Sequence, residues 1–356
     1  MSGGGGADAV VVPAEELLAL AAGLLASLGV APDDARVTAD VFVGAELSGE
    51  PSHGLRLLLT VCDRIEAGGH RARTEIVVER EVGAIAVWSA NRSIGQVVAT
   101  RAMAAAIGKA KVDGIGLVAV RDATSLTSAK HYALAAARAG AVGLVLTNAS
   151  RKVMPPPGGT TPVMGNNPLA IAAPAGRYGA FALDMAMTAA AIERINVAAE
   201  RGEPIPPDWA LGPDGRPTTD PLAAQRIMTL LPFGGYKAFG LGLAVEMLTS
   251  VLAGGEVFCG ASAGFRPAQA PMNTSFALVA IDLEVFGGRA AFEARMEEMI
   301  ERMKASAPAE PGGEILFPGE RSQRLTAERL AGGVPVARAT LEAVRARART
   351  LGAAVD

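Results

Sequence analysis

The amino-acid sequence predicts an α/β protein whose sheet is covered by helices on both faces. Apolar segments of strand length alternate with helical segments along residues 75–147, the pattern expected of strands buried between helices. Hydrophobic residues make up 50% of the 356 residues, but aromatic residues only 4%, so Ala, Val, Leu and Ile must build the core. A chain of this length can bury a large core in two or three subdomains.

The segment before this region is predicted to be helical. The first helix, residues 13–29, carries leucine at every third or fourth position between an initial proline and a final glycine. A second helix is expected at about 32–47. The sequence SGEPSHG at 48–54 then interrupts the helical pattern before a third helix at about 55–67.

Strands and further helices follow along the chain. The predicted strands are 75–79, 84–88, 115–120, 142–147, 169–173, 179–183 and 275–282. The predicted helices of this region are 97–111, 129–138, 184–201 and 241–252. Three helices near 288–305, 325–331 and 336–351 complete the chain.

Composition and spacing exclude several classes of protein. The net charge of −3 gives no reason to expect nucleic acid or an anionic membrane as partner. Cys62 and Cys259 form no CxxC motif, and the three histidines lack the spacing of a metal site. No apolar run is long enough to cross a bilayer. Residues 1–12, MSGGGGADAVVV, lack the basic and apolar regions of a signal peptide, so we expect a flexible tail and a cytoplasmic protein.

The stretch from Leu144 to Ala186 is the first candidate for a ligand site. A buried strand opens there into a long loop rich in Pro, Gly and Asn, and two further apolar runs close it. Loops at strand ends hold ligands in many α/β proteins, because their backbone N–H groups are free. The alternative is a plain surface connection, which loop composition alone favours.

Several ordered motifs resemble one family across nearly the whole chain. They are SHG at 52–54, ANRSIGQ, LVLTNASRKVMPPPGG, GNNPLAIAAP, LDMA, PDWALGPDGRPTTDP, GGYKAFGLGL and FPGERSQR. The sequence is similar to the NAD(P)-dependent malate/L-lactate/L-sulfolactate dehydrogenases, and the DMAMT segment and the VWSANRSIG turn look most similar to 2,3-diketo-L-gulonate reductases.

The resemblance implies a fold, a cofactor and an oligomeric state. The expected fold is not a Rossmann fold, in agreement with the lack of a GxGxxG motif after the first strand. Residues 73–285 would form an L-sulfolactate-dehydrogenase-like α/β domain that binds NAD or NADP. Residues 13–72 and 286–356 would form a helical domain from both chain ends. A homodimer whose cleft is completed by the second subunit is also implied.

His53 is the first candidate for catalysis. Reduction of a carbonyl by hydride needs a proton donor near the oxygen, and an imidazole titrates near neutral pH. Taken alone, a histidine that follows serine at a helix start is more often a residue of the helix cap. The resemblance assigns His53 the role of proton donor and places Ser52, Arg56 and Asn148 on the substrate side.

Positions on the substrate side depart from the family pattern. Many relatives carry a second histidine where Ser125 stands, and a serine hydroxyl cannot store a proton at neutral pH. They also carry arginine four residues after the SHG histidine, where this chain has Leu57. Arg56 lies one position earlier, about 100° around a helix. The change of the family's Gly-Thr-Asn-Pro to Gly-Asn-Asn-Pro at 165–168 is milder.

Lys130 and His131 stand where relatives mostly have small or aromatic residues. Either could be a relocated acid or an anchor for an anion. The alternative is that both belong to the polar face of the 129–138 helix.

The resemblance places the dinucleotide against four short segments. We expect the segment from Asp184 to Thr188 to begin a helix whose N–H groups receive a phosphate. We expect Lys237 to contact the diphosphate. The segments are Gly165, Asn166 and Asn167; Asp184, Met185, Ala186, Met187 and Thr188; Tyr236 and Lys237; and Gly319, Glu320 and Arg321.

The expected activity is hydride transfer between nicotinamide and a small 2-oxo acid, 2-hydroxy acid or cyclic imine, preferably in the reducing direction. The imine substrate is favoured because an iminium arrives already protonated, so a site without the second histidine loses less activity with it. The alternative is that the fold serves non-redox chemistry, as a lyase or cyclase would, or ligand binding alone.

Overall fold

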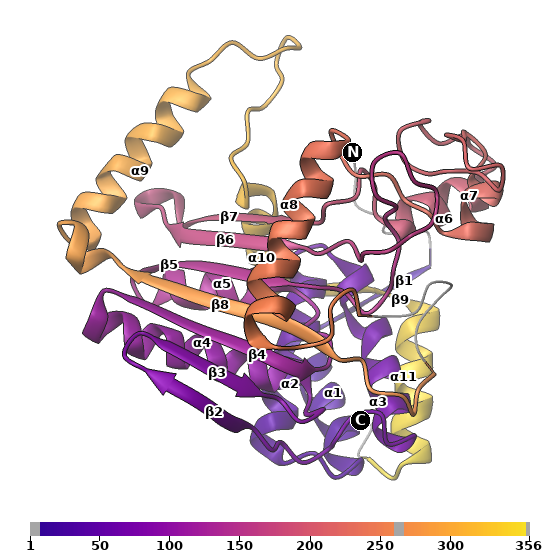
Figure 1. Ribbon diagram of the computed structural model, residues 1–356, viewed down its shortest axis with the longest axis horizontal. Coiled ribbons are helices and arrows are strands. Elements are labelled where there is room, and N and C mark those ends of the chain that lie inside the picture. The colour runs from indigo at the N-terminus through magenta and orange to yellow at the C-terminus, as the bar shows by residue number, and fades with distance from the viewer. Residues whose placement is uncertain (1–7, 260–266, 354–356) are drawn as a thin grey trace.

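A seven-stranded mixed sheet forms the centre of the molecule (Figure 1). The structure, a computed structural model, describes residues 8–259 and 267–353. The strand order is β2-β3-β4-β8-β5-β6-β7, and β3 and β4 are parallel while the other neighbours are antiparallel. The strands are β2 (Val77–Val82), β3 (Ile85–Ser89), β4 (Ile115–Ala123), β5 (Ala141–Thr147), β6 (Leu169–Pro174), β7 (Ala180–Met185) and β8 (Thr274–Asp282).

One face of the sheet packs against α4 (Gly95–Asp113) and α5 (Ala129–Arg138). The helices approach the strands closely, because small residues line both sides. A Cβ atom added to Gly116 would lie 2.0 Å from the carbonyl oxygen of Ala106 on α4. Alanine and valine therefore build this core, as the composition predicts.

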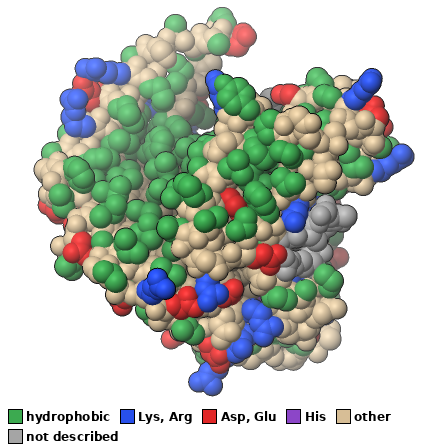
Figure 2. Space-filling view, in the orientation of Figure 1, with side chains coloured by type: hydrophobic (Ala, Val, Ile, Leu, Met, Phe, Trp, Pro, Cys, Tyr) green, Lys and Arg blue, Asp and Glu red, His purple; other side chains and the backbone are tan. Residues whose placement is uncertain are grey.

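The other face is only partly covered in the single chain. The strand register aligns six apolar side chains across six strands: Ile85, Leu117, Val279, Leu144, Ile171 and Leu183. Part of this row packs under α8 (Tyr236–Glu246) and its π-helical continuation Met247–Val251, whose outer side chains are exposed. Figure 2 shows the result as a broad apolar area. The prediction that helices cover both faces is therefore wrong for one chain by itself.

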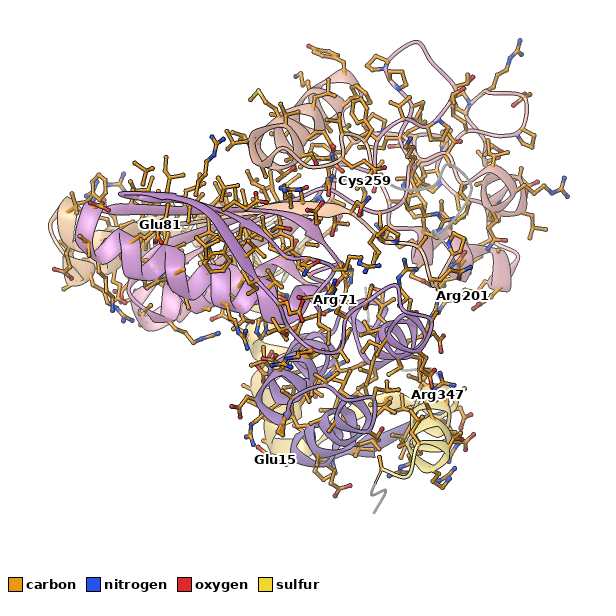
Figure 3. All side chains as sticks on the ribbon, turned by 60° about the horizontal axis from the view of Figure 1, so that its bottom comes forward. Glu15, Arg71, Glu81, Arg201, Cys259 and Arg347 are labelled. Atoms are coloured by element: carbon orange, nitrogen blue, oxygen red, sulfur yellow. The ribbon has the colours of Figure 1, made fainter. Side chains whose placement is uncertain are left out.

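Both chain ends build a helical unit beside the sheet. It contains α1 (Ala14–Ser27), α2 (Pro32–Leu47), α3 (Leu55–Glu66) and α11 (Arg338–Thr350), which share one apolar core. Figure 3 shows Glu15 and Arg347 on this unit and Glu81 on the sheet. The predicted tail is wrong in part, because β1 (Ala9–Val12) pairs with β9 (Val334–Ala337) and Val12 is buried. Residues 1–7 of that tail lie outside the described residues.

The helix predicted to begin at Asp184 begins later. Asp184 and Met185 instead complete β7, because they pair with Ala170 and Leu169 of β6. The helix that follows is α6 (Ile192–Arg201), and α7 (Pro221–Ile227) lies beyond the Pro-rich loop. Toward the carboxyl end, α9 (Arg289–Lys304) contacts β6 and the turn Gly176–Tyr178, and α10 (Glu320–Gly332) contacts α2 and β7.

The domain boundaries predicted from the sequence, 13–72 with 286–356 and 73–285, stay a prediction.

Among residues 8–259 and 267–353, no helix is both long and apolar enough to span a membrane.

Candidate active site

The break between α2 and α3 holds His53 in a fixed backbone. Pro51–His53 forms one 3₁₀ turn, and the buried Glu46 accepts a 3.0 Å hydrogen bond at Oε1 from the N–H of Leu55. A Cβ atom at Gly54 would lie 2.0 Å from that oxygen, so a glycine is required there. Arg329 of α10 donates to the carbonyl oxygen of Glu46 from the other side. Glu46 thus connects the start of α3, directly after the SHG sequence, with α2 and α10.

The His53 side chain is exposed at the edge of a hollow that its neighbours line. Its Nδ1 lies 3.1 Å from Ser52 Oγ, which leaves Nε2 for proton exchange with a ligand. Burial by the surrounding protein is the main cause that lowers its pKa, Glu50 and Glu193 raise the pKa, and Lys130 lowers it. The hollow is lined by Pro51, Ser52 and Arg56, so a ligand held there would lie close to the imidazole.

Lys130 connects this break to α5 and β7. Its side chain is buried and forms an ion pair with Glu50, while its backbone N–H donates a 2.9 Å hydrogen bond to Asp184 Oδ2. The pKa of Asp184 is raised to about 6, chiefly by burial and also by Glu50. The alternative that Lys130 belongs to an outer polar helix face is therefore wrong, because the residue is only 6% exposed.

His131 lies on a different side of α5. Its Nε2 is 3.7 Å from Asp40 Oδ2 on α2, and its ring meets that of Tyr132 edge-on with centroids 5.2 Å apart. Burial lowers its pKa. These contacts place His131 in the seam between α2 and α5, so a role as relocated acid at the cleft is not supported.

Ser125 and Arg56 make only local or peripheral contacts in the structure. Ser125 Oγ accepts a hydrogen bond from the N–H of Thr127, 3.2 Å away within the same loop. Arg56 is exposed and pairs with Glu193 of α6 at 3.2 Å. Both partners of that pair, together with Ser52, line a hollow of about 770 Å³ beside the break. Within the described part of the chain, no hydrogen bond joins Ser125 to His53.

Two asparagines predicted to bind ligands instead hold the 148–168 loop. Asn148 Oδ1 accepts from the N–H of Ser275 at 2.8 Å, and its Nδ2 donates to Ser250 Oγ at 2.6 Å. Asn167 is fully buried and donates to Glu246 Oε2 at 2.8 Å. Since these amide groups are satisfied inside the protein, the predicted substrate contact of Asn148 and the predicted cofactor contact of Asn167 are not supported.

The structure brings three of the predicted cofactor segments together. The N–H of Met187 donates to the carbonyl oxygen of Asn166 at 2.8 Å, and the N–H of Phe233 donates to that of Met187 at 3.1 Å. The same loop leads into α8, where Tyr236 and Lys237 are exposed. Met187 itself is fully buried, and so only the backbone of this part of the loop can face a ligand.

The remaining residues of these segments occupy neighbouring backbone positions. Because Asp184 and Met185 lie at the end of a strand, the predicted phosphate site at a helix start is wrong. Ala186 follows directly, and Thr188 bridges to Pro232. Gly165 lies against Ala149, since a Cβ atom there would be 2.7 Å from Ala149 Cβ.

The fourth segment reaches the opposite end of β7. The N–H of Ala182 donates to the carbonyl oxygen of Pro318 at 2.9 Å, which places Gly319 beside the strand. Glu320 is buried and accepts from Lys304 Nζ at 2.8 Å, so its carboxylate stabilises the loop. Arg321 is exposed.

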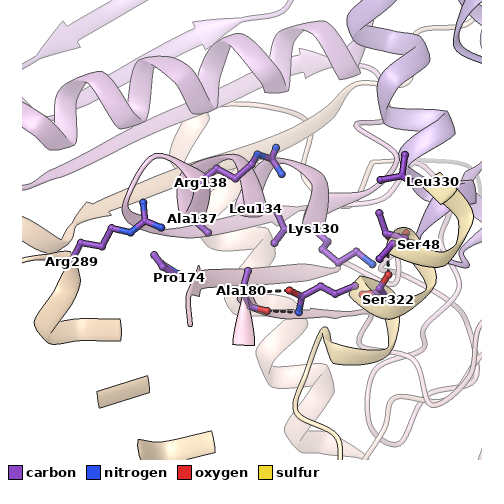
Figure 4. Close-up of a pocket in the computed structure, with 14 residues that line it drawn as sticks. Ser48, Lys130, Leu134, Ala137, Arg138, Pro174, Ala180, Arg289, Ser322 and Leu330 are labelled. Atoms are coloured by element: carbon purple, nitrogen blue, oxygen red, sulfur yellow. Dashed lines mark hydrogen bonds between the residues drawn. The ribbon is translucent and has the colours of Figure 1, made fainter. Parts of the chain in front are cut away.

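A groove runs between α5 and α10 (Figure 4). Its volume is about 440 Å³, with Lys130 and Ser322 among its lining residues. Gln323 fixes one wall, because its amide exchanges hydrogen bonds of 3.0 and 2.7 Å with the backbone of Ala180. Arg138 and Arg289 also line the groove. Sequence reasoning missed these two arginines and Glu50, since nothing local in the sequence marks them as neighbours.

Among the residues that the structure describes, no group of three or more His, Cys, Asp or Glu side chains is placed to hold a metal ion.

Comparison with known proteins gives consistent matches over almost the full length. The family model described as malate/L-lactate dehydrogenase matches residues 12–345. L-sulfolactate dehydrogenase of Methanocaldococcus jannaschii is 38% identical over 301 residues, which cover 85% of this chain and 86% of that protein. Malate dehydrogenase of Pyrococcus abyssi is 34% identical over 96% of this chain and 95% of its own. A 2,3-diketo-L-gulonate reductase of Mannheimia succiniciproducens is 27% identical over 90% and 95%.

Two solved structures show the same fold. The M. jannaschii sulfolactate dehydrogenase superposes with a TM-score of 0.88 at 34% identity and covers 97% of this chain and 98% of its own. Δ1-piperideine-2-carboxylate reductase of Pseudomonas syringae superposes with a TM-score of 0.85 at 27% identity, over 95% of this chain and 99% of its own.

Proposed function

The chain belongs to the malate/L-lactate dehydrogenase family and is an NAD(P)-dependent oxidoreductase; from that premise we propose that it transfers a hydride between nicotinamide and a small 2-oxo acid, 2-hydroxy acid or cyclic imine. The observation that carries the assignment of the site is His53, an exposed imidazole that Ser52 orients at the edge of the hollow lined by Ser52, Arg56 and Glu193. A non-redox use of the fold finds no support, because the relatives named above are all dehydrogenases or reductases.

The residues beside the cleft fit a dinucleotide. The groove between α5 and α10 is lined by the cations Lys130, Arg138 and Arg289 and by hydroxyl and amide groups of α10. Cations and amide donors suit phosphate and ribose oxygens. We assign this groove, the Asp184–Thr188 backbone and Lys237 to the cofactor. When bound, its nicotinamide ring supplies or accepts the hydride.

His53 moves the proton that accompanies the hydride. In reduction its protonated Nε2 donates to the oxygen formed from the carbonyl, and in oxidation its neutral Nε2 accepts the proton of the hydroxyl. Ser52 orients the ring through Nδ1. Reduction remains the direction that the sequence predicts. The lowered pKa favours the neutral imidazole, which is the form that accepts the hydroxyl proton in oxidation.

A cyclic imine substrate is supported by the loss of one acid. Ser125 stands where many relatives carry a second histidine, and a serine hydroxyl does not store a proton at neutral pH. An iminium arrives already protonated, so a site without the second acid loses less with this substrate. Piperideine carboxylate reductase, a structural neighbour, acts on such a substrate by its name.

Absorbance at the reduced-nicotinamide band tests the proposal. The purified protein is mixed with NADH or NADPH and a panel of 2-oxo acids and cyclic imino acids, and with NAD or NADP and 2-hydroxy acids. We expect turnover with at least one member, and calorimetry should detect binding of a dinucleotide. A protein that binds neither NAD(H) nor NADP(H) would overturn the proposal.

The proposal includes a homodimer in the cytoplasm. The apolar row across the sheet is covered only in part within one chain, and the outer side chains of α8 are exposed, which supports a second copy as the missing cover of this face.

A further inference from the structure

A buried ion pair lies next to the proposed proton donor. Lys130 Nζ contacts Glu50 Oε1, and the two side chains are 8% and 32% exposed. Glu50 belongs to the break that carries His53, three residues ahead of it, and the N–H of His53 donates to the carbonyl oxygen of Glu50 at 2.9 Å. The pair therefore joins the backbone of the proton donor to the first turn of α5.

The pair also determines what Lys130 is free to do. An ammonium that left Glu50 for a substrate carboxylate would leave a partly buried carboxylate without its partner, which is costly. The backbone N–H of Lys130 is meanwhile committed to Asp184 at 2.9 Å. Lys130 is thus fixed at its ammonium and at its backbone N–H, so it connects structural elements and is not free to move to a substrate carboxylate.

We propose that Glu50 and Lys130 are positioning residues, which hold the His53 break against α5 and keep opposite charges in balance around the imidazole. This inference rests on the proposed function of His53 as proton donor.

The charged groups around His53 come from three elements. Glu50 lies on its own break, Lys130 on α5 and Glu193 on α6, where Arg56 pairs with Glu193. Burial lowers the pKa of His53, Glu50 raises it, Lys130 lowers it and Glu193 raises it. The two members of the pair therefore act on the pKa of His53 in opposite directions. Loss of one member leaves the other uncompensated.

Proton NMR of the ring C–H groups measures this balance without any turnover. The chain has three histidines, and the signal of His53 is assigned by its loss in His53→Ala. We expect Lys130→Gln to raise the pKa of His53 and Glu50→Gln to lower it, each by roughly 0.5–1 pH unit. The double variant should return close to the wild-type value, because both charges are removed together. Lys130→Arg, which keeps the charge, should also stay close to it.

A matched control is the ion pair between Lys109 and Glu81, 2.7 Å apart on α4 and β2. Lys109 has a similarly buried side chain, 13% exposed, and Lys109→Gln should leave the His53 titration unchanged. Shifts in the same direction for both single variants, or shifts no larger than in the control, would overturn the inference.

The pH dependence of kcat/KM separates this inference from the proposed function. With an active substrate, the pH limb assigned to His53 should move up in Lys130→Gln and down in Glu50→Gln, and it should return close to the wild-type position in the double variant. In that variant kcat should stay lowered, because the pair that holds the break against α5 is lost. If the enzyme turns over substrate but the pH limb does not move in either single variant, the inference is overturned and the proposed function stands. If the two single variants shift the NMR titration of His53 in opposite directions but the protein never turns over nicotinamide, the charge balance is supported and the role of His53 as proton donor is rejected.

Discussion

At the scale of single residues, His53 is the side chain on which the proposed chemistry depends. Its Nδ1 is oriented by Ser52 and its Nε2 is left for a ligand. We expect His53→Ala to lower the rate with a keto substrate by about 10²–10⁴-fold, the usual contribution of a positioned general acid. Steady-state kinetics and calorimetry measure the rate and the cofactor affinity, which should barely change. A loss below about threefold with ketone and imine alike, far under that range, would make His53 structural.

Ser125 offers a test by gain of activity. Its side chain is exposed between the buried Thr124 and Leu126 and accepts a hydrogen bond from the N–H of Thr127. We expect Ser125→His to leave ketone reduction unchanged or to raise it, because the change restores the group that many relatives carry there. The measured quantity is kcat/KM with the same keto substrate. A large loss with unchanged stability would show that the hydroxyl itself is needed.

Glu46 links the position of His53 to the pH dependence of stability. Burial raises its pKa to about 7, above its ordinary value of 4.5. Between these two values the folded state binds more protons than the unfolded state, so this carboxyl lowers stability as pH rises from 4.5 to 7. Glu46→Gln keeps an oxygen for the N–H of Leu55 and removes the charge. We expect the variant to gain on the order of 2 kcal/mol over wild type at pH 8.

Urea denaturation at two pH values checks this expectation. The gain should vanish near pH 4, where the Glu46 carboxyl is mostly protonated in the folded and in the unfolded state. Glu203→Gln, a change at an exposed carboxylate, serves as control and should show no such difference. An equal gain at both pH values would mean that packing of the amide, and not the lost charge, stabilises the variant.

At the scale of elements, the start of α8 is the clearest test of the cofactor site. Lys237 is exposed at the first turn, beside the loop that joins Asn166, Met187 and Phe233. If its ammonium contacts the diphosphate, Lys237→Ala should weaken dinucleotide binding by about 1–3 kcal/mol. Calorimetry measures this, with Lys111→Ala, an exposed lysine of α4, as control. Equal affinity in both variants would remove Lys237 from the site.

The regular elements follow from the sequence because their signals are local. The helix predicted at 129–138 has the bounds of α5, and the strand predicted at 142–147 differs from β5 by one residue. Periodicity and flanking glycines decide such segments. The segment after Asp184 was mispredicted because an acidic residue before Ala and Thr is typical of a helix start, whereas pairing with β6 extends the strand.

Interactions between distant segments could not be predicted from local patterns. Glu50 and Lys130 are 80 residues apart, and Asn148 and Glu246 are 98 residues apart. Asparagines in a Gly/Pro loop have the same local appearance whether they face a ligand or a buried carboxylate. The family resemblance located the SHG break, but only the three-dimensional neighbours separate Lys130, beside the cleft, from His131, in the seam with α2.

At the scale of the whole molecule, the partly covered sheet face is the feature that one chain leaves incomplete. Six apolar residues form a row across six strands, and the outer side of α8 and its π-helical turn extends the apolar surface. Monomeric proteins rarely leave such a large contiguous area exposed. Lys237 lies in the first turn of α8, the helix on this face, so a second copy seated there would lie close to the proposed cofactor site.

Met247 provides the test, because its side chain is 54% exposed in the single chain and lies on this surface. A glutamate there costs the monomer little, but a dimer interface would have to bury its charge without a partner. We therefore expect Met247→Glu to convert the dimer into a folded monomer at micromolar concentration, measured by light scattering. The control is Val112→Glu at the end of α4, where valine is 83% exposed and α4 covers the opposite face of the sheet. That variant should remain a dimer. A wild-type protein that is monomeric, or a Met247→Glu variant that remains dimeric, would exclude this face as the interface.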